Sequence, residues 1–131
     1  MASLGTKVLL PHDVETVWNT LFNFEEYKSW RTDLKELTVV SVLEFIEHTK
    51  DGYDTTYKIT QIEEKERLEF DIDNMNLKGH WVLQFIPKGK ATMVTLQQKV
   101  NAKKLYMQPF VSSYLKSQQL LYISDLKKQL S

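Results

Sequence analysis

A histidine and two aspartates in the middle of the chain are the first residues whose types suggest proton transfer. Asp71 and Asp73 lie two positions apart in a predicted strand, and paired carboxylates are common general acids and bases. They alternate with apolar residues, so we expect their shared face to meet solvent. His80 has the parity opposite to Trp81, so we expect this histidine to point outward and to have no catalytic role.

Glu47 is the carboxylate that could instead lie inside the protein. It shares the parity of Phe45, and a buried carboxylate in a cavity would be a candidate acid or base. Carboxylates in strands are usually exposed, so we expect Glu47 to face solvent and keep the buried position as the alternative. The side on which Glu47 points therefore decides whether a reaction would have this group to use.

Metal-dependent and nucleophilic chemistry find little support in the sequence. The chain has no cysteine, which excludes thiol nucleophiles and zinc–cysteine sites. His12 and His48 have no second ligand at metal-binding spacing, and the chain has neither a Gly-x-Ser-x-Gly elbow nor a phosphate-binding glycine loop. We therefore predict no catalytic residue, no metal site and no cofactor.

Ligand binding is the chemistry that the remaining polar and aromatic residues favour. Asn74 and Gln98 fall on the inner parity of their strands, and a buried amide is costly unless a protein group, a water or a ligand bonds to it. A buried tyrosine hydroxyl has the same need. The predicted ligand-binding residues are Tyr57, Phe70, Asn74, Trp81, Gln98, Tyr106, Phe110 and Tyr114. The same side chains could equally well form a solid core.

The composition limits the partners that the protein could have. The 131 residues include 17 basic and 17 acidic side chains, so the basic excess of a nucleic-acid binder is absent. No apolar run approaches the roughly 18 residues of a membrane span, and the N-terminus lacks the apolar core of a signal peptide. We expect one cytoplasmic domain over residues 1–131, with a small hydrophobic ligand as partner and with an oligomeric state that the sequence does not determine.

The elements that must position these residues follow an unusual order. Alternation over Leu4–Leu10 predicts a strand, and apolar spacing between Val14 and Trp30 predicts two short helices, the first capped by Asp13. We expect Asn23 to cap the second helix, with Glu26 as its capping-box partner. The pattern predicts that this helix pair leads directly into a sheet.

The rest of the chain predicts an antiparallel meander closed by a long helix. Strand patterns recur about every ten residues from Leu37 to Val100, with a hairpin turn at Asp51–Gly52. Asn101 is the expected cap of the closing segment, in which Pro109 should start the main helix or kink it. The closing segment is long enough for its helix to cross the whole sheet. The space between this helix and the sheet is therefore the place where we expect a ligand site.

Four segments of the chain resemble the START-like superfamily, also called SRPBCC. They are Leu10–Trp18 (LPHDVETVW), Phe24–Trp30 (FEEYKSW), Gly79–Phe85 (GHWVLQF) and Thr92–Thr95 (TMVT), and the closing helix matches in place and length. The resemblance implies a helix-grip α+β fold. In that fold a curved antiparallel seven-stranded sheet carries two short helices after its first strand, and a long C-terminal helix lies over its concave face.

The resemblance also implies a class of function. The superfamily includes the birch-pollen allergen, lipid-transfer domains and polyketide cyclases, so it implies that a lipid, isoprenoid or aromatic metabolite binds between helix and sheet. A cyclase or dehydratase that uses the same cavity is the first alternative. A protein-binding module of the chaperone-activator type is the second. The superfamily has no shared catalytic motif, so the resemblance assigns no catalytic residue to this chain.

Overall fold

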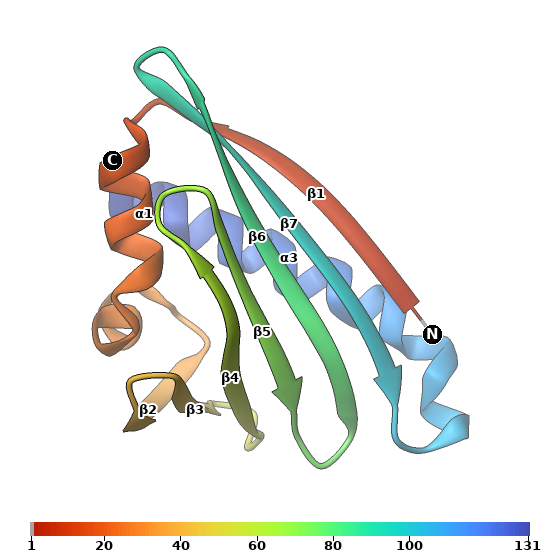
Figure 1. The fold of residues 1–131 in the computed structure, drawn as a ribbon. Helices are drawn as coiled ribbons and strands as arrows, with labels where there is room; N and C mark the ends of the chain where they lie inside the picture. The colour runs from red at the N-terminus through yellow and green to blue at the C-terminus, as the bar shows by residue number, and fades with distance from the viewer. Residues whose placement is uncertain (1) are drawn as a thin grey trace.

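Seven strands form one antiparallel sheet in the computed structural model, which describes residues 2–131 (Figure 1). The strands are β1 (Ala2–Leu10), β2 (Leu34–Ser41), β3 (Glu44–Thr49), β4 (Asp54–Glu63), β5 (Arg67–Asp73), β6 (Leu77–Lys88) and β7 (Ala91–Ala102). Their spatial order is β1-β7-β6-β5-β4-β3-β2, so strands β2 to β7 form the predicted meander and β1 pairs with the last of them. The first and second strands therefore occupy the two edges.

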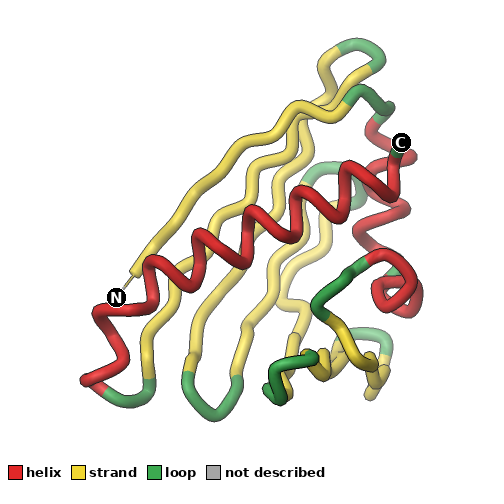
Figure 2. The backbone as a smooth tube through the Cα atoms, turned by 180° about the vertical axis from the view of Figure 1, so that it is seen from behind, coloured by secondary structure: helices red, strands yellow, loops and turns green. Residues whose placement is uncertain are grey.

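A long helix crosses one face of this sheet obliquely, and the sheet curves around it (Figure 2). The helices are α1 (Val14–Phe22), α2 (Tyr27–Trp30) and α3 (Gln108–Leu130), with short 3-10 turns η1 (Phe24–Glu26) and η2 (Leu105–Met107). Helix α3 packs against β1, β7 and α2. This arrangement confirms the predicted helix-grip fold.

The local signals around the first two helices were only partly predictive. Asp13 caps α1 as expected, because its carboxylate accepts a hydrogen bond from the Thr16 N–H at 2.8 Å. The capping box predicted for Asn23 and Glu26 is wrong, since neither side chain caps the backbone there. Instead the chain turns through η1, and the ring of Phe24 packs edge-on against Tyr27. Aromatic packing rather than a cap therefore sets the angle between α1 and α2.

The start of the closing helix also lies later than predicted. Strand β7 continues through Ala102, so Asn101 is a strand residue and the prediction that it caps the helix is wrong. Helix α3 begins at Gln108, with Pro109 in its first turn, where a missing N–H costs nothing. The Gln108 side chain accepts a hydrogen bond from the Ala102 N–H at 2.9 Å and so ties the helix start to the end of the sheet.

Aromatic side chains fill most of the space between the short helices and the sheet. Their rings meet in pairs with centroids 4.6–6.2 Å apart, in both stacked and edge-on geometries, which adds to the energy of burial. The cluster comprises Phe24, Tyr27, Trp30, Phe45, Tyr57, Phe70, Trp81 and Tyr122. These rings form the part of the core that lies beside α1 and α2.

The hairpin of β2 and β3 differs from the rest of the surface. The end of β2 and the turn that follows it expose four apolar side chains at the edge of the sheet, namely Val39, Val40, Val42 and Leu43. The sequence did not predict this exposed apolar group. No helix within the described residues 2–131 has both the length and the apolar character needed to cross a membrane.

Candidate functional site

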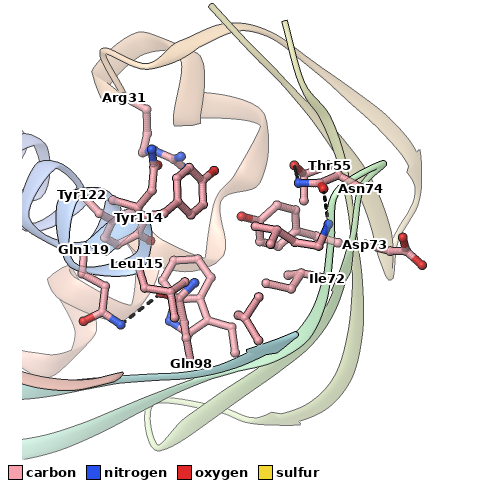
Figure 3. Close-up of a pocket in the computed structure, with 15 residues that line it drawn as sticks. Arg31, Thr55, Ile72, Asp73, Asn74, Gln98, Tyr114, Leu115, Gln119 and Tyr122 are labelled. Carbon is pink, nitrogen blue, oxygen red and sulfur yellow. Dashed lines mark hydrogen bonds between the residues drawn. The ribbon is translucent and has the colours of Figure 1, made fainter. Parts of the chain in front are cut away.

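Two adjoining cavities lie between α3 and the sheet. The inner cavity, about 60 Å³ in volume, has walls from β4, β5, β6, β7 and α3, and Arg31 closes one side (Figure 3). The outer cavity, about 140 Å³, is almost wholly apolar and is lined by Met107, Phe110 and Val111 near the start of α3. Asn74, Leu77 and Tyr114 line both cavities, so the two adjoin, and the outer one is called the mouth below.

Five of the eight predicted ligand-binding residues line the inner cavity. Tyr57, Asn74, Trp81, Gln98 and Tyr114 reach it from β4, the turn after β5, β6, β7 and α3. The structure therefore brings together residues that are far apart in the sequence. Whether they bind a ligand stays a prediction.

The other three predicted residues lie elsewhere. Phe70 is 1% exposed and belongs to the aromatic core, so it lines neither cavity. Phe110 lines only the mouth, where its ring is 70% exposed. Tyr106 is 72% exposed in η2 and lines neither cavity. Tyr106 precedes α3, so it does not share the helix face that lies over the sheet.

An amide pair bridges sheet and helix on the floor of the inner cavity. Gln119 of α3 donates from Nε2 to Oε1 of Gln98 at 3.0 Å and to the Leu4 carbonyl at 3.4 Å (Figure 3). Its own Oε1 accepts from the Thr6 hydroxyl at 2.6 Å. Since a carbonyl can only accept, the Leu4 contact fixes which end of the Gln119 amide is the nitrogen. The pair holds α3 at a defined height above β1 and β7.

Asn74 stabilises the turn between β5 and β6 as well as lining both cavities. Its side-chain oxygen accepts from the backbone N–H groups of Asn76 and Leu77, each at 2.8 Å. Its nitrogen donates to the Thr55 hydroxyl at 3.1 Å (Figure 3). Asn74 therefore lines the cavity, but two backbone N–H groups already donate hydrogen bonds to its side-chain oxygen.

A buried ionic cluster forms the wall beside α2. Arg31 is 6% exposed, and its guanidinium binds the Glu47 carboxylate through Nη1 at 2.9 Å and Nη2 at 3.2 Å. It also binds Asp33 through Nε at 3.1 Å and Nη2 at 3.0 Å. Burial alone would lower the pKa of Arg31, but the two carboxylates outweigh that effect and raise the pKa well above its usual value. Arg31 therefore stays charged.

The expected exposure of Glu47 is wrong. The side chain is 2% exposed on the inner face, in line with Phe45, because Arg31 supplies the charge that makes its burial tolerable. Glu47 nevertheless does not line the inner cavity, since Arg31 lies between them. A carboxylate held in two hydrogen bonds to a guanidinium is a poor general base, so this geometry favours an anchoring role.

The tyrosines of the cavity are held in their neutral form. Burial is the main cause that raises the pKa of Tyr57 well above its usual value and that of Tyr114 to about 12. Both therefore keep their hydroxyl proton at any physiological pH and can donate it in a hydrogen bond. Such groups can orient the oxygen of a ligand.

Solved structures identify the fold. Neither a family model nor a curated protein sequence matches this chain. A START superfamily protein from Mycobacterium smegmatis superposes with a TM-score of 0.90 at 13% identity, over 98% of this chain and 96% of that one. The Zhui aromatase/cyclase from Streptomyces sp. R1128 gives 0.89 at 6% identity, over 98% and 93%. The chain has a START-like fold. At these identities the likeness establishes the architecture alone.

A third START-like neighbour carries no functional description. It is a conserved protein from Geobacillus kaustophilus, with a TM-score of 0.79 and 15% identity over 98% of this chain and 95% of that one. All three superpositions cover nearly the full length of both chains, so they include α3 and every strand that lines the cavities.

Several residues that build this START-like cavity were not predicted from the sequence. Arg31, Thr55, Gln119 and Tyr122 all line it. The only signal for Gln119 was a polar residue interrupting the apolar stripe of α3, and such an interruption is usually solvent-facing. Arg31 follows Trp30 directly, at the end of a helix, where basic residues are common on the surface.

The helix also carries a second buried polar residue that was not expected. Asp125 of α3 is 2% exposed and accepts hydrogen bonds from both the N–H and the hydroxyl of Thr32, each at 2.9 Å. Thr32 is the neighbour of Arg31, so this contact fastens the segment carrying the guanidinium to the far half of α3. The position of Arg31 thus depends on the closing helix.

His80 lies on the outer face of the sheet, as predicted. Its ring nitrogens lie 2.7 Å from Glu69 and 2.7 Å from Asp71, while Trp81 faces the core. Partial burial would lower the pKa of His80, but these hydrogen bonds outweigh it and raise the pKa. The hydrogen bond from His80, followed by that from Arg67, lowers the pKa of Glu69. These charged side chains form a network on the outer face of the sheet and line neither cavity.

We expect His80→Gln to reduce stability mainly between about pH 4.5 and 6.5. A raised His80 pKa stabilises the folded protein fully below 6.5, the ordinary value, and less as the pH rises through the folded pKa. A lowered Glu69 pKa stabilises it above 4.5 and less in stronger acid. The loss should stay below about 1 kcal/mol, because His80 is partly exposed and water screens the contact. Urea unfolding of the variant and of His12→Gln, the control, across this range would check it; equal losses at pH 5 and 9 would contradict it.

No group of three or more His, Asp or Glu side chains within residues 2–131 is arranged to hold a metal ion. His48 is engaged with Asp54 at 2.8 Å and with the Thr38 hydroxyl at 2.8 Å.

Proposed function

We propose that this protein binds or carries a small hydrophobic or amphipathic molecule between α3 and the sheet. The observation that carries the proposal is the pair of adjoining cavities, one almost wholly apolar, the other with polar and apolar walls in similar measure. Such a combination of apolar walls with a few placed polar groups is typical of small-molecule sites. The aromatase/cyclase and START superfamily neighbours support it at the level of the fold.

The cavity volumes indicate the size of the ligand. Sites for drug-sized molecules usually exceed about 300 Å³, whereas these two measure about 60 and 140 Å³. A dry cavity of roughly 150 Å³ can hold a benzene ring. A ligand with one or two rings, or a short chain, therefore fits better than a long-chain lipid. A larger ligand would have to displace Tyr114, which lines both cavities.

A cyclase or dehydratase reaction in the same cavity is the alternative. It requires a group that accepts a proton from the substrate. Glu47, the carboxylate considered for that role, is bound to Arg31 and does not line the cavity. The neutral tyrosines could polarise a carbonyl. The one carboxylate among the described lining residues, Asp73, is paired with Lys103 and points away from the cavity (Figure 3). Binding therefore accounts for the geometry with fewer additional requirements.

Filling the region where the two cavities adjoin should abolish binding. Leu77 lines both cavities, so we expect Leu77→Trp to lose a stoichiometric ligand seen by native mass spectrometry after gentle purification. We also expect it to lose the methyl chemical-shift changes of Val111 and Leu115 that added indane causes in the wild type. Both readouts report occupancy of the same space.

The matched control places the same bulk outside the site. Leu120→Trp lies on α3, where Leu120 is exposed and lines neither cavity, and should bind as the wild type does. Circular dichroism would establish that both variants are folded. Equal binding by the two variants, or no binding of indane and no retained ligand in the wild type, would refute the proposal.

A further inference from the structure

Among the buried polar side chains around the inner cavity, the amide oxygens have protein partners, whereas several N–H and O–H donors do not. Six of them line it and are at least nine-tenths buried, namely Arg31, Tyr57, Trp81, Gln98, Gln119 and Tyr122. Their two amide oxygens both accept from protein groups, Gln98 from Gln119 and Gln119 from Thr6. Both amide oxygens therefore already accept one hydrogen bond from the protein.

Several donors of the same set have no protein partner. The indole N–H of Trp81 is buried without one, and no described residue accepts from the Tyr57 hydroxyl or from Nε2 of Gln98. Arg31 has five N–H groups and uses four on Glu47 and Asp33, which leaves one on Nη1. Of these donors the Trp81 N–H is fully buried, and a buried donor without an acceptor is costly. A bound oxygen would therefore find several donors that no described residue uses.

The orientation of the Gln98 amide follows from its neighbours. The Leu4 carbonyl can only accept, which fixes the Gln119 nitrogen, and that nitrogen then requires an oxygen on Gln98. The nitrogen of Gln98 is therefore the free end. The Tyr122 hydroxyl also has no partner at hydrogen-bonding distance, although it lies near that of Tyr27, which donates to the Leu21 carbonyl.

The local charge decides between a neutral and an anionic oxygen. Arg31 is the one cation among the residues that line the inner cavity, and it is bound by two carboxylates, Glu47 and Asp33. The cluster therefore carries a formal charge of about −1, counting one guanidinium against two carboxylates. An anionic head group would lose its hydration and would be repelled by this excess negative charge. A neutral carbonyl oxygen avoids both costs.

We propose that the ligand is a neutral carbonyl compound whose oxygen lies in the inner cavity and whose apolar ring or chain fills the mouth. This inference rests on the proposed binding function and adds the chemical class of the ligand. The oxygen accepts from Tyr57, Gln98 or the free N–H of Arg31, and the body packs against Leu77, Val111 and Phe110. Ketones, quinones and lactones of one or two rings meet both requirements.

Three probes of similar shape test the chemical class of the ligand independently of whether the cavities bind a ligand at all. They are 1-indanone, with a neutral carbonyl, indane, with no oxygen, and indane-1-carboxylate, with an anionic head. Calorimetric titration should give 1-indanone an affinity about tenfold above that of indane, as expected for one or two net hydrogen bonds. The carboxylate should bind more weakly than 1-indanone.

A matched pair of tyrosine variants tests the placement of the oxygen. Tyr57→Phe removes a hydroxyl with no described acceptor and should weaken 1-indanone about three- to tenfold while leaving indane unchanged. Tyr106→Phe removes an exposed hydroxyl that lines neither cavity and should change nothing. The infrared carbonyl stretch of bound 1-indanone should shift to lower frequency in the wild type and less so in Tyr57→Phe.

The outcomes distinguish failure of the carbonyl inference from failure of the proposed binding function. Equal affinity for 1-indanone and indane, tightest binding of the carboxylate, or an equal loss for both neutral probes in Tyr57→Phe would overturn the carbonyl inference and leave the binding function standing. Binding of none of the three probes would overturn the binding function, and the carbonyl inference with it. Unchanged indane binding by Tyr57→Phe also establishes that the variant is folded.

Discussion

Arg31→Met is expected to lower the free energy of unfolding by about 3–5 kcal/mol. The variant removes the one cation that faces two carboxylates, of which Glu47 is almost fully buried and Asp33 largely so. A buried ion pair adds little net stability, but removal of one partner leaves a charge without either water or a counter-charge. Urea unfolding followed by circular dichroism at pH 8 would measure the loss.

The loss should be smaller at pH 5 than at pH 8. In the variant a proton can neutralise an unpaired carboxylate, and protonation becomes easier as the pH falls. The double variant Arg31→Met/Glu47→Leu should recover part of the stability, because it replaces the buried pair with apolar groups of similar size. An Arg31→Met variant as stable as the wild type at pH 8, or one no better after the second change, would contradict this account.

An exposed ion pair of the same chain provides the control. Lys28 and Glu36 lie 3.1 Å apart with both side chains more than half exposed. Lys28→Met should therefore change stability little, since water and salt already screen the pair. The contrast between Lys28→Met and Arg31→Met isolates burial as the cause of the large effect.

The same cluster explains what sequence could predict of the site and what it could not. Alternation in β5 and β6 was enough to place Trp81 inside and His80 outside, because side chains on a strand point to opposite faces in turn. The parity of Glu47 was equally clear. Its burial was not, because that depends on Arg31, which lies sixteen residues earlier in the chain and belongs to no strand. A pairing between distant elements leaves no periodic signal.

The residues that line the cavity also divide into those that strand parity predicts and those that only the docking of α3 places. Tyr57 and Gln98 follow from strand parity alone. Gln119 has no such signal, because its burial results from the exact position of α3 over Leu4 and Thr6. Tyr106 lies outside both cavities because the helix begins only at Gln108, and Phe110, in the first turn of that helix, lines the outer cavity alone. The fold therefore follows from local patterns, whereas the polar part of the site follows from how the elements dock.

Gly79→Ala is the second substitution with a large expected effect. Gly79 lies in β6, paired with Ile72 of β5 and Val100 of β7, where the strands approach closely. A Cβ atom at this position would overlap the Lys99 carbonyl oxygen and would come within 2.9 Å of Cγ2 and 3.0 Å of Cα of Val100. Two of these atoms belong to the backbone, so a side-chain rotation cannot relieve the overlap.

We therefore expect Gly79→Ala to lower the free energy of unfolding by about 3 kcal/mol or more, or to prevent folding. Gly5→Ala is the matched control, because Gly5 lies in β1 with no atom within 4 Å of the added Cβ. That variant should be neutral or gain up to about 1 kcal/mol, since alanine loses less backbone freedom on folding. Urea unfolding of both would check the pair, and a Gly79→Ala loss below 1 kcal/mol would show that β6 and β7 can separate there. Because Leu77, Trp81 and Val100 line the inner cavity around Gly79, such a separation would widen the ligand site itself.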